Sequence, residues 1–250
     1  MRRFLGIGTA LCGLLMPVAL MAQDASSLRQ DVGVFPSESD VPPAPWRLVR
    51  FKESVPPTDY RIRAWAGEFA IEAHAHASMA LLARPIQIDL VRTPILCWRW
   101  RIDAPIAAAD LREKSGDDYA ARVYVAFRIP PESMSWVTRS KLALARSVFG
   151  AEVPDAALNY VWDNRHPIGT VTPNAYTERA MMIVARSGAA DAGRWVSERR
   201  DVLADIRSAF GAGSFTPVLL AVASDGDDTG SSAHAGFARL RFVARGASCD

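Results

Sequence analysis

The sequence lacks the short motifs that mark several large enzyme classes. It contains no Gly-x-Ser-x-Gly elbow, no phosphate-binding loop, no glycine-rich dinucleotide fingerprint and no His-Glu-x-x-His motif. These absences argue against the hydrolases, nucleotide-binding proteins and zinc proteases that such motifs identify. Binding proteins, structural proteins and enzymes without a local signature remain.

The chain also has little net charge. It carries 29 Lys and Arg residues against 27 Asp and Glu residues. Without residues 1–22, which hold two arginines and no acidic residue, 27 basic residues balance 27 acidic ones. A nucleic-acid partner favours a strongly basic surface, so the balance argues against one.

Long apolar runs are absent after the first residues. Phe4–Leu20 is apolar, Arg2 and Arg3 precede it, and the small residue Ala22 follows. This layout predicts a signal peptide over residues 1–22 and export to the periplasm or beyond the cell. Because no later run approaches membrane-spanning length, we expect no transmembrane anchor after cleavage.

Cysteine is scarce, with three residues in the chain, of which Cys12 lies in the predicted signal peptide. An oxidising compartment allows Cys97 and Cys249 to pair. However, Cys249 is almost terminal, and a frayed end is a poor partner for a small buried residue such as Cys97. The sequence therefore favours two unpaired cysteines, although it does not decide the question.

The remaining chain shows a β-rich pattern. Ile95–Ile102 and Ala121–Phe127 alternate between two unlike faces, and Ala66–Gly67 is a two-residue hairpin connection. Roughly ten short strands of this kind accompany two helices, one over Glu132–Gly150 and one capped by Asp201. Because strands and helices do not alternate, we predict an all-β, mainly antiparallel, jelly-roll-like β-sandwich with one or two short helices.

We expect one domain, preceded by a flexible segment. Residues 23–45 are rich in Ser, Asp and Pro, which indicates a linker or loosely held arm. The globular domain is predicted over residues 46–245, and residues 246–250 form a tail.

Four motifs occur in order: WRW at Trp98–Trp100, DDYAARVYVAF at Asp117–Phe127, LNYVW at Leu158–Trp162 and SDGDDTG at Ser224–Gly230. Through these four motifs, the chain resembles the exported bacterial domain-of-unknown-function family numbered 3047, and the resemblance covers about residues 46–245. The resemblance implies a single domain similar to galactose-binding or lectin-like jelly rolls. It supplies no reaction, because fold analogy is a poor guide to function.

Aromatic and arginine side chains form the first candidate site. Sugar rings stack on aromatic faces, and arginine binds carboxylates bidentately, so this combination suits a glycan or another polar small molecule. The candidate ligand-binding residues are Asp117, Asp118, Arg122, Tyr124, Tyr160, Trp162, Trp100 and Arg99.

An alternative role for these residues is structural. Large aromatic residues such as Trp98, Trp100 and Trp162 are usually well buried, and Arg122 can form an ion pair with Asp117 or Asp118. For the tryptophans the sequence favours the core. The stronger candidates for a site are therefore Asp117, Asp118, Arg122 and Tyr124.

Two metal sites are conceivable. Asp225, Asp227 and Asp228 lie in a glycine-bearing loop with Thr229, a combination that can bind Ca²⁺ but also builds ordinary turns. His74-x-His76 on one strand face can place two imidazoles on a metal, but no third ligand is apparent nearby, although Glu72 lies on the same face. For both groups the sequence favours a structural role without a bound metal, and we expect no other cofactor.

Enzymatic activity is the less favoured hypothesis. A polysaccharide lyase needs a base and an arginine, and Tyr124, Tyr160, His166, Arg99 and Arg122 have the required types. A glycosidase needs two facing carboxylates, for which Asp110, Glu113, Asp117 and Asp118 are available. We rank a carbohydrate-binding protein first, a cell-envelope lyase or hydrolase second, and a structural envelope protein third.

Overall fold

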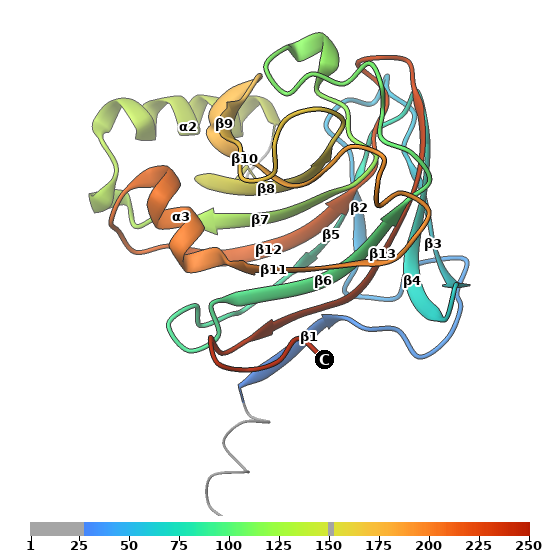
Figure 1. Cartoon of the computed structure of the whole chain (residues 1–250). Coiled ribbons are helices and arrows are strands. Elements are labelled where there is room, and N and C mark those ends of the chain that lie inside the picture. Colours follow the sequence, from blue (N-terminus) through green and yellow to red (C-terminus); the bar gives the residue numbers. More distant parts are fainter. Residues whose placement is uncertain (1–27, 150–152) are drawn as a thin grey trace, which may run out of the picture.

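The computed structural model describes residues 28–149 and 153–250, which form a sandwich of two β-sheets (Figure 1). The predicted signal peptide and Gly150 lie outside the described residues. The first sheet has the order β11-β6-β13-β4-β3, with β1 also paired to β13. Its strands are β1 (Arg29–Gly33), β3 (Asp59–Trp65), β4 (Glu68–His76), β6 (Ile95–Ile102), β11 (Val196–Asp201) and β13 (Ser232–Val243).

The second sheet has the order β2-β5-β12-β7-β8-β10-β9. Its strands are β2 (Arg47–Val49), β5 (Leu81–Pro85), β7 (Arg122–Arg128), β8 (Ala156–Asp163), β9 (Val171–Asn174), β10 (Thr177–Ser187) and β12 (Thr216–Ala223). Among the described strands, β8 and β10 run parallel and the other pairs are antiparallel. The predicted mainly antiparallel β-sandwich with two helices is confirmed.

Period-two alternation places the core between the sheets. On β6, Trp98 and Trp100 point inward and are buried, while Arg99 and Arg101 lie on the outer face. On β7, Val123 and Val125 point inward in the same way. Because neighbouring side chains of a strand face opposite ways, each strand supplies both a core face and a second face.

Helix α3 (Val202–Phe210) closes one side of the core. Asp201 caps it by accepting a hydrogen bond from the backbone N–H of Ala204, and Gly211 follows its last turn. Val202 and Ile206 are fully buried in the main core. This helix therefore begins where the sequence predicts.

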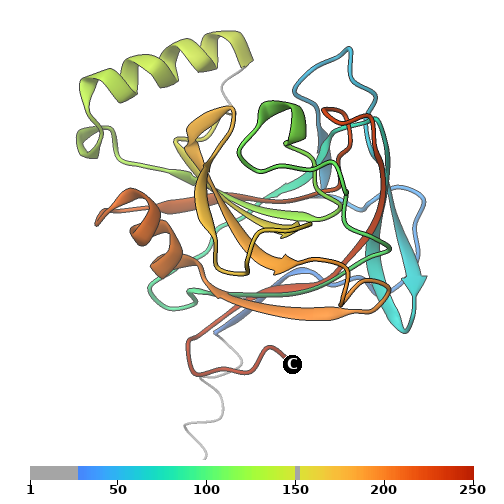
Figure 2. The ribbon, with the colours of Figure 1, turned by 45° about the horizontal axis from the view of Figure 1, so that its top comes forward.

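Helix α2 (Trp136–Phe149) lies at the periphery of the sandwich, as Figures 1 and 2 show. Its apolar side chains Trp136, Val137 and Leu144 are exposed. Leu142 is the buried contact instead. Short 3₁₀ turns also occur at Lys114–Gly116 and Pro131–Ser133. No helix in the described part of the chain has the length and apolar character needed to span a membrane.

Part of the predicted arm is ordered. Arg29–Gly33 forms β1, which pairs antiparallel with β13, and Phe35 and Trp46 pack against each other in the core. The described part of residues 23–45 thus contributes to the sandwich, in contrast to the expected loose linker. The physical reason is that β4 pairs with β13 only over Ser232–Phe237, so the backbone groups of residues 240–243 are available to β1.

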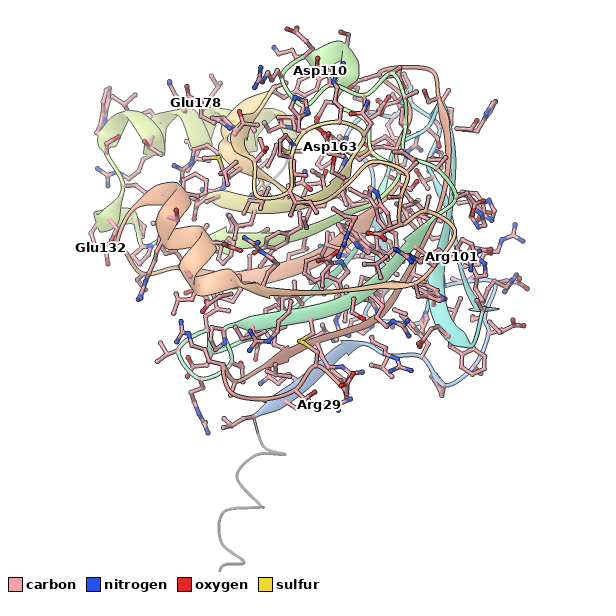
Figure 3. All side chains as sticks on the ribbon, viewed as in Figure 1. Arg29, Arg101, Asp110, Glu132, Asp163 and Glu178 are labelled. Carbon is pink, nitrogen blue, oxygen red and sulfur yellow. A yellow bond between two sulfur atoms is a disulfide. The ribbon has the colours of Figure 1, made fainter. Side chains whose placement is uncertain are left out.

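Cys97 and Cys249 form a disulfide, so the expectation of unpaired cysteines is wrong (Figure 3). The tail folds back because Arg241 donates a hydrogen bond to the carbonyl of Cys249, at 3.0 Å. Cys249 also packs beside Ile95 and Val243. A disulfide requires an oxidising compartment and is consistent with export.

Candidate functional site

The aromatic motifs meet in the core. Trp98 and Trp100 of β6 face Tyr160 and Trp162 of β8 across the sandwich, with ring centroids 5.4 and 5.6 Å apart. All four side chains are at most 1% exposed. They therefore cannot stack on a ligand, and the predicted aromatic ligand face is absent at Trp100, Tyr160 and Trp162.

The polar atoms of three of these four rings form hydrogen bonds inside the protein, and the indole N–H of Trp98 does not. The indole N–H of Trp100 donates to Glu198, and that of Trp162 donates to the carbonyl of Gly188. The hydroxyl of Tyr160 donates to Asp205 at 2.8 Å. Such internal pairing is what allows large amphipathic rings to be buried.

Arg99 lies apart from the other predicted residues. It projects from the outer face of the first sheet and forms an ion pair with Glu68. Glu68 also pairs with Arg239 at 2.8 Å. This contact links β4, β6 and β13, and it has no link to the second sheet.

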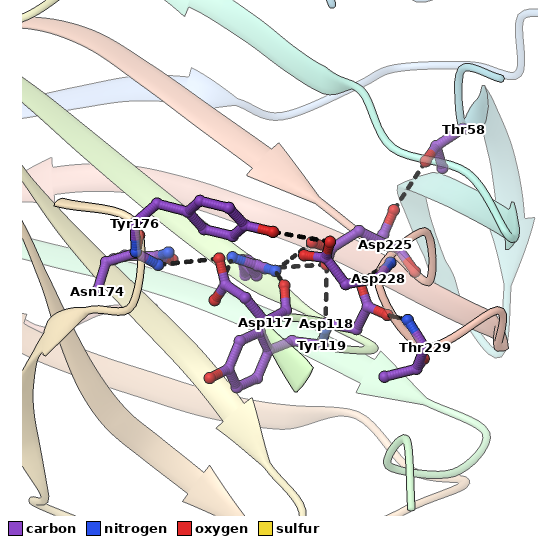
Figure 4. Close-up of polar contacts among 12 residues, drawn as sticks. Thr58, Asp117, Asp118, Tyr119, Asn174, Tyr176, Asp225, Asp228 and Thr229 are labelled. Atoms are coloured by element: carbon purple, nitrogen blue, oxygen red, sulfur yellow. Dashed lines mark hydrogen bonds and ion pairs between the residues drawn. The ribbon is translucent and has the colours of Figure 1, made fainter. Parts of the chain in front are cut away.

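The other two motifs meet at one end of the second sheet (Figure 4). Strand β12 pairs with β7 so that Ala223 lies opposite Arg122, and the loops next to both residues therefore adjoin. We call the resulting group the charged loop cluster. It consists of Asp117, Asp118, Arg122, Asp225, Asp227 and Asp228.

Arg122 is the anchor of the charged loop cluster. Its Nε lies 2.9 Å from Asp225 Oδ1, its Nη2 also pairs with Asp225, and its Nη1 lies 3.4 Å from Asp117 Oδ1. Burial favours the neutral guanidine, but the two carboxylates raise the pKa of Arg122 well above its usual value. Arg122 is 2% exposed and holds the two loops together, so it does not offer a free guanidinium to a ligand.

Asp118 fastens the second loop. Its carboxylate accepts hydrogen bonds from the backbone N–H groups of Thr229, at 2.6 Å, and Asp228, at 3.3 Å. Carboxylate oxygens of Asp118, Asp227 and Asp228 lie within 4.8 Å of one another. Among the residues that the structure describes, no ion pair joins these three carboxylates to a basic side chain.

These carboxylates repel one another. Partial burial raises the pKa of Asp227 above its ordinary value, and the charges of Asp228 and Asp118 add to this effect. The pKa of Asp228 is also raised, by burial first and then by Asp118 and Asp117. A divalent cation would relieve the repulsion.

The group of carboxylates that could hold a cation differs by one residue from the group that the sequence suggested. Asp225 was expected to join Asp227 and Asp228, but its carboxylate turns inward to Arg122 and to the backbone N–H of Tyr119. Asp118 takes the third position in its place. Spacing along one loop does not show which of its carboxylates an arginine from another strand will bind.

A rim of exposed polar groups borders the cluster. Tyr176, in the turn between β9 and β10, is 49% exposed and donates a hydrogen bond to Asp228 at 2.8 Å. Asn174 donates to Asp117 at 2.9 Å. The ammonium groups of Lys114 and Lys52, two of the three lysines in the chain, lie 5.4 and 6.0 Å from the centroid of the Tyr176 ring.

Sequence analysis did not identify this rim. Asn174 and Tyr176 lie in a short turn, where Asn174 accepts from the backbone N–H of Tyr176. An asparagine side chain that accepts from the backbone N–H two residues on forms an ordinary Asx turn, so the pattern carried no functional signal.

Tyr124 is a poor general base in this arrangement. Its hydroxyl accepts a hydrogen bond from Arg122 at 3.2 Å, and burial raises its phenol pKa above the ordinary value. A lyase would need a tyrosine that loses its proton easily beside an arginine free to bind a uronate. This pair has the right residue types but neither property, so the geometry does not favour the lyase.

Two surface hollows lie away from the cluster. One, of about 540 Å³, borders Arg128, Pro131 and Asp155, and the other, of about 400 Å³, borders Pro42 and Trp46. Neither is lined by a residue of the charged loop cluster. The cluster and its rim are therefore distinct from both hollows.

Comparison with known proteins identifies the family. No curated protein matches the chain. The solved xyloglucanase domain of NopAA, a type three effector from Sinorhizobium fredii in complex with cellobiose, is 9% identical, with a TM-score of 0.37 over 82% of this chain and 100% of that one. This score is too low to support an argument about function. The family described as "Protein of unknown function (DUF3047)" matches residues 44–241, and the chain belongs to that family.

Proposed function

We propose that this protein is an exported β-sandwich that binds a hydroxyl-rich polar ligand, of the carbohydrate class, at the rim of the charged loop cluster. The observation that carries the proposal is the exposed ring of Tyr176, which lies beside carboxylate, amide and ammonium groups. An apolar ring face next to mixed hydrogen-bonding groups matches the two kinds of surface that a sugar presents.

The residues of the rim have different proposed roles. Tyr176 supplies the ring face, while Asp228 and Asn174 supply acceptors and donors for hydroxyl groups. Arg122 and Asp118 lie beneath them and hold the loops, through ion pairs and backbone hydrogen bonds. Asp117, Asp118, Arg122 and Tyr124 thus remain in the proposed site, but mainly as its support.

A glycan-array screen of the purified protein, followed by titration of the best glycan, tests this proposal. We expect Tyr176→Ala to weaken binding about tenfold, which corresponds to the loss of one aromatic contact. Phe69→Ala is the matched control, because Phe69 is similarly exposed, at 42%, but lies on the other sheet.

Two results would count against the proposal. If no glycan binds, the structural-protein hypothesis replaces it. If Phe69→Ala weakens binding as much as Tyr176→Ala does, the ligand binds elsewhere. Melting temperatures of Tyr176→Ala and Phe69→Ala that equal that of the unchanged protein would show that a loss of binding in either variant does not come from unfolding.

A further inference from the structure

The outer face of the first sheet brings histidines together from two strands. His74 of β4 lies directly opposite His234 of β13 in the antiparallel register. Glu72 precedes His74 by two residues and so projects from the same face. Sequence spacing suggested His76 as the second imidazole, but His76 instead bonds to the hydroxyl of Ser232 at 2.7 Å.

The three side chains converge on one point. His234 Nε2 lies 3.0 Å from Glu72 Oε1, and His74 Nε2 lies 3.5 Å from Glu72 Oε2. Ligand atoms around a tetrahedral zinc ion, bound at about 2.0–2.1 Å, are about 3.3 Å apart. The two histidine–carboxylate separations bracket that value, and the donor atoms of all three residues lie within 4.8 Å of one another.

The hydrogen-bonding of His234 points to a missing positive charge. Its Nδ1 lies 2.8 Å from Asp103 Oδ2, and its Nε2 faces Glu72. A neutral imidazole has one N–H and one lone pair, so it cannot donate to both carboxylates. If Nδ1–H donates to Asp103, a metal ion between Nε2 and Glu72 satisfies the second contact, as in carboxylate–histidine–metal arrangements.

The surroundings hold His234 in place. Its ring stacks on Trp65, with centroids 4.2 Å apart. Trp65 lies close to the sheet because residue 236 is glycine: a Cβ there would lie 2.9 Å from the Trp65 ring and 2.7 Å from that of Trp195. One ligand is therefore preorganised by packing on one side and by Asp103 on the other.

We propose that Glu72, His74 and His234 form a binding site for a divalent transition metal of the zinc class, with Asp103 as a positioning residue. Imidazole and carboxylate donors suit such ions, and three protein ligands leave an open coordination position. The His74 and His234 rings are now stacked at 4.1 Å, so their lone pairs lie in nearly parallel planes. Binding therefore requires His74, whose side chain is 52% exposed, to turn out of the stack.

This site does not depend on the proposed glycan site, which lies on the other sheet. Calorimetric titration of the chelator-treated protein with ZnCl₂ at pH 7.5 tests it directly. We expect one zinc ion per chain, and a Co²⁺ absorption spectrum with the intense bands of a four- or five-coordinate nitrogen and oxygen site.

Matched variants locate the metal. His74→Gln and His234→Gln should each weaken zinc binding more than about 100-fold, and Asp103→Asn about 10- to 100-fold, as for other outer partners of ligating histidines. His76→Gln is the control, since His76 is on the same strand face but outside the cluster, and it should leave zinc binding unchanged.

Three results would overturn the proposal. One is the absence of stoichiometric zinc binding, with an NMR spectrum that shows His234 protonated on both nitrogens; the histidine would then be a salt-bridged cation. Another is binding that persists in His74→Gln and His234→Gln but is lost in Asp227→Asn, which would place the ion in the acidic loop. The third is an equal loss in His76→Gln.

Discussion

Two pairs of sequence motifs meet in this sandwich, one pair between the sheets and one at their end. WRW and LNYVW form a buried aromatic cluster whose polar atoms all bond to nearby protein groups, apart from the indole N–H of Trp98. DDYAARV and SDGDDTG form the charged loop cluster, in which one arginine faces several carboxylates. The first pair explains why the fold is stable. The second retains unbalanced charge near solvent, and this imbalance is where the proposed ligand would gain binding energy.

The largest expected effect belongs to the aromatic cluster. Trp100→Ala should lower the free energy of unfolding by about 3–5 kcal/mol, because it removes a large buried ring and leaves a cavity. Denaturant unfolding measures this change. Glycan affinity per folded molecule should stay the same, and a drop in affinity would mean that the two clusters are not separate in function.

Loss of the buried Arg122 guanidinium should lower the free energy of unfolding nearly as much as Trp100→Ala does. Arg122→Met leaves Asp117 and Asp225 buried without their partner, which we expect to lower the free energy of unfolding by about 3–5 kcal/mol. The double variant Arg122→Met with Asp225→Asn should recover part of the loss. If the double variant is as unstable as the single one, uncompensated charge is not the cause.

Calcium should stabilise the charged loop cluster and leave the aromatic cluster unchanged. With Ca²⁺ at one hundred times its dissociation constant, the free energy of unfolding should rise by about 3 kcal/mol, and EDTA should reverse the rise. Asp228→Asn should remove the effect, whereas Asp110→Asn, a loop carboxylate paired with Arg165, should not. A melting temperature that does not respond to chelator would exclude calcium at these carboxylates.

The smallest expected effect is the change in stability with pH in the absence of calcium. The raised pKa values of Asp227 and Asp228 mean that the folded protein takes up protons at higher pH than the unfolded chain does. Stability should therefore increase as pH falls from neutral through the raised pKa values toward the ordinary value of 3.8. Because both groups are partly exposed, screening limits the gain to less than about 1 kcal/mol.

Comparison with the double variant Asp227→Asn, Asp228→Asn isolates this effect. The variant should be the more stable protein at pH 7 in EDTA, and the difference should vanish near pH 4. A difference that grows as pH falls would have the wrong sign for repelling carboxylates.

Local patterns predicted the fold better than they predicted the site. Ile95–Ile102 was predicted with its observed bounds, and Asp201 caps α3 as expected, because alternation and capping depend on residues close in sequence. Strand β1 and the disulfide were missed because each depends on a partner more than 150 residues away. The strand pattern of Trp98–Arg101 showed two faces but did not show which one points inward.

For the site, residue types were easier to predict than partners. The two acidic loops that the sequence offered as candidates adjoin in the structure, yet the choice between Asp118 and Asp225 depends on where Arg122 points. Tyr176 and His234 come from other strands, and only the pairing of β4 with β13 brings His234 next to His74. A site that is assembled from separate strands has no characteristic residue spacing, so the sequence alone does not predict it.

The disulfide and β1 limit which fragment of this protein can be expected to fold. The family match spans residues 44–241, so a fragment with those limits would lose both β1 and Cys249. It would also lose Phe242 and Val243, which are buried. Leu240 and Arg241 of β13 would then lack their β1 partners, and Ile95 and Leu96 of β6 would lack Val243 and Phe242. These unpaired strand ends would be templates for other chains, and such a fragment would tend to aggregate for reasons unrelated to either cluster.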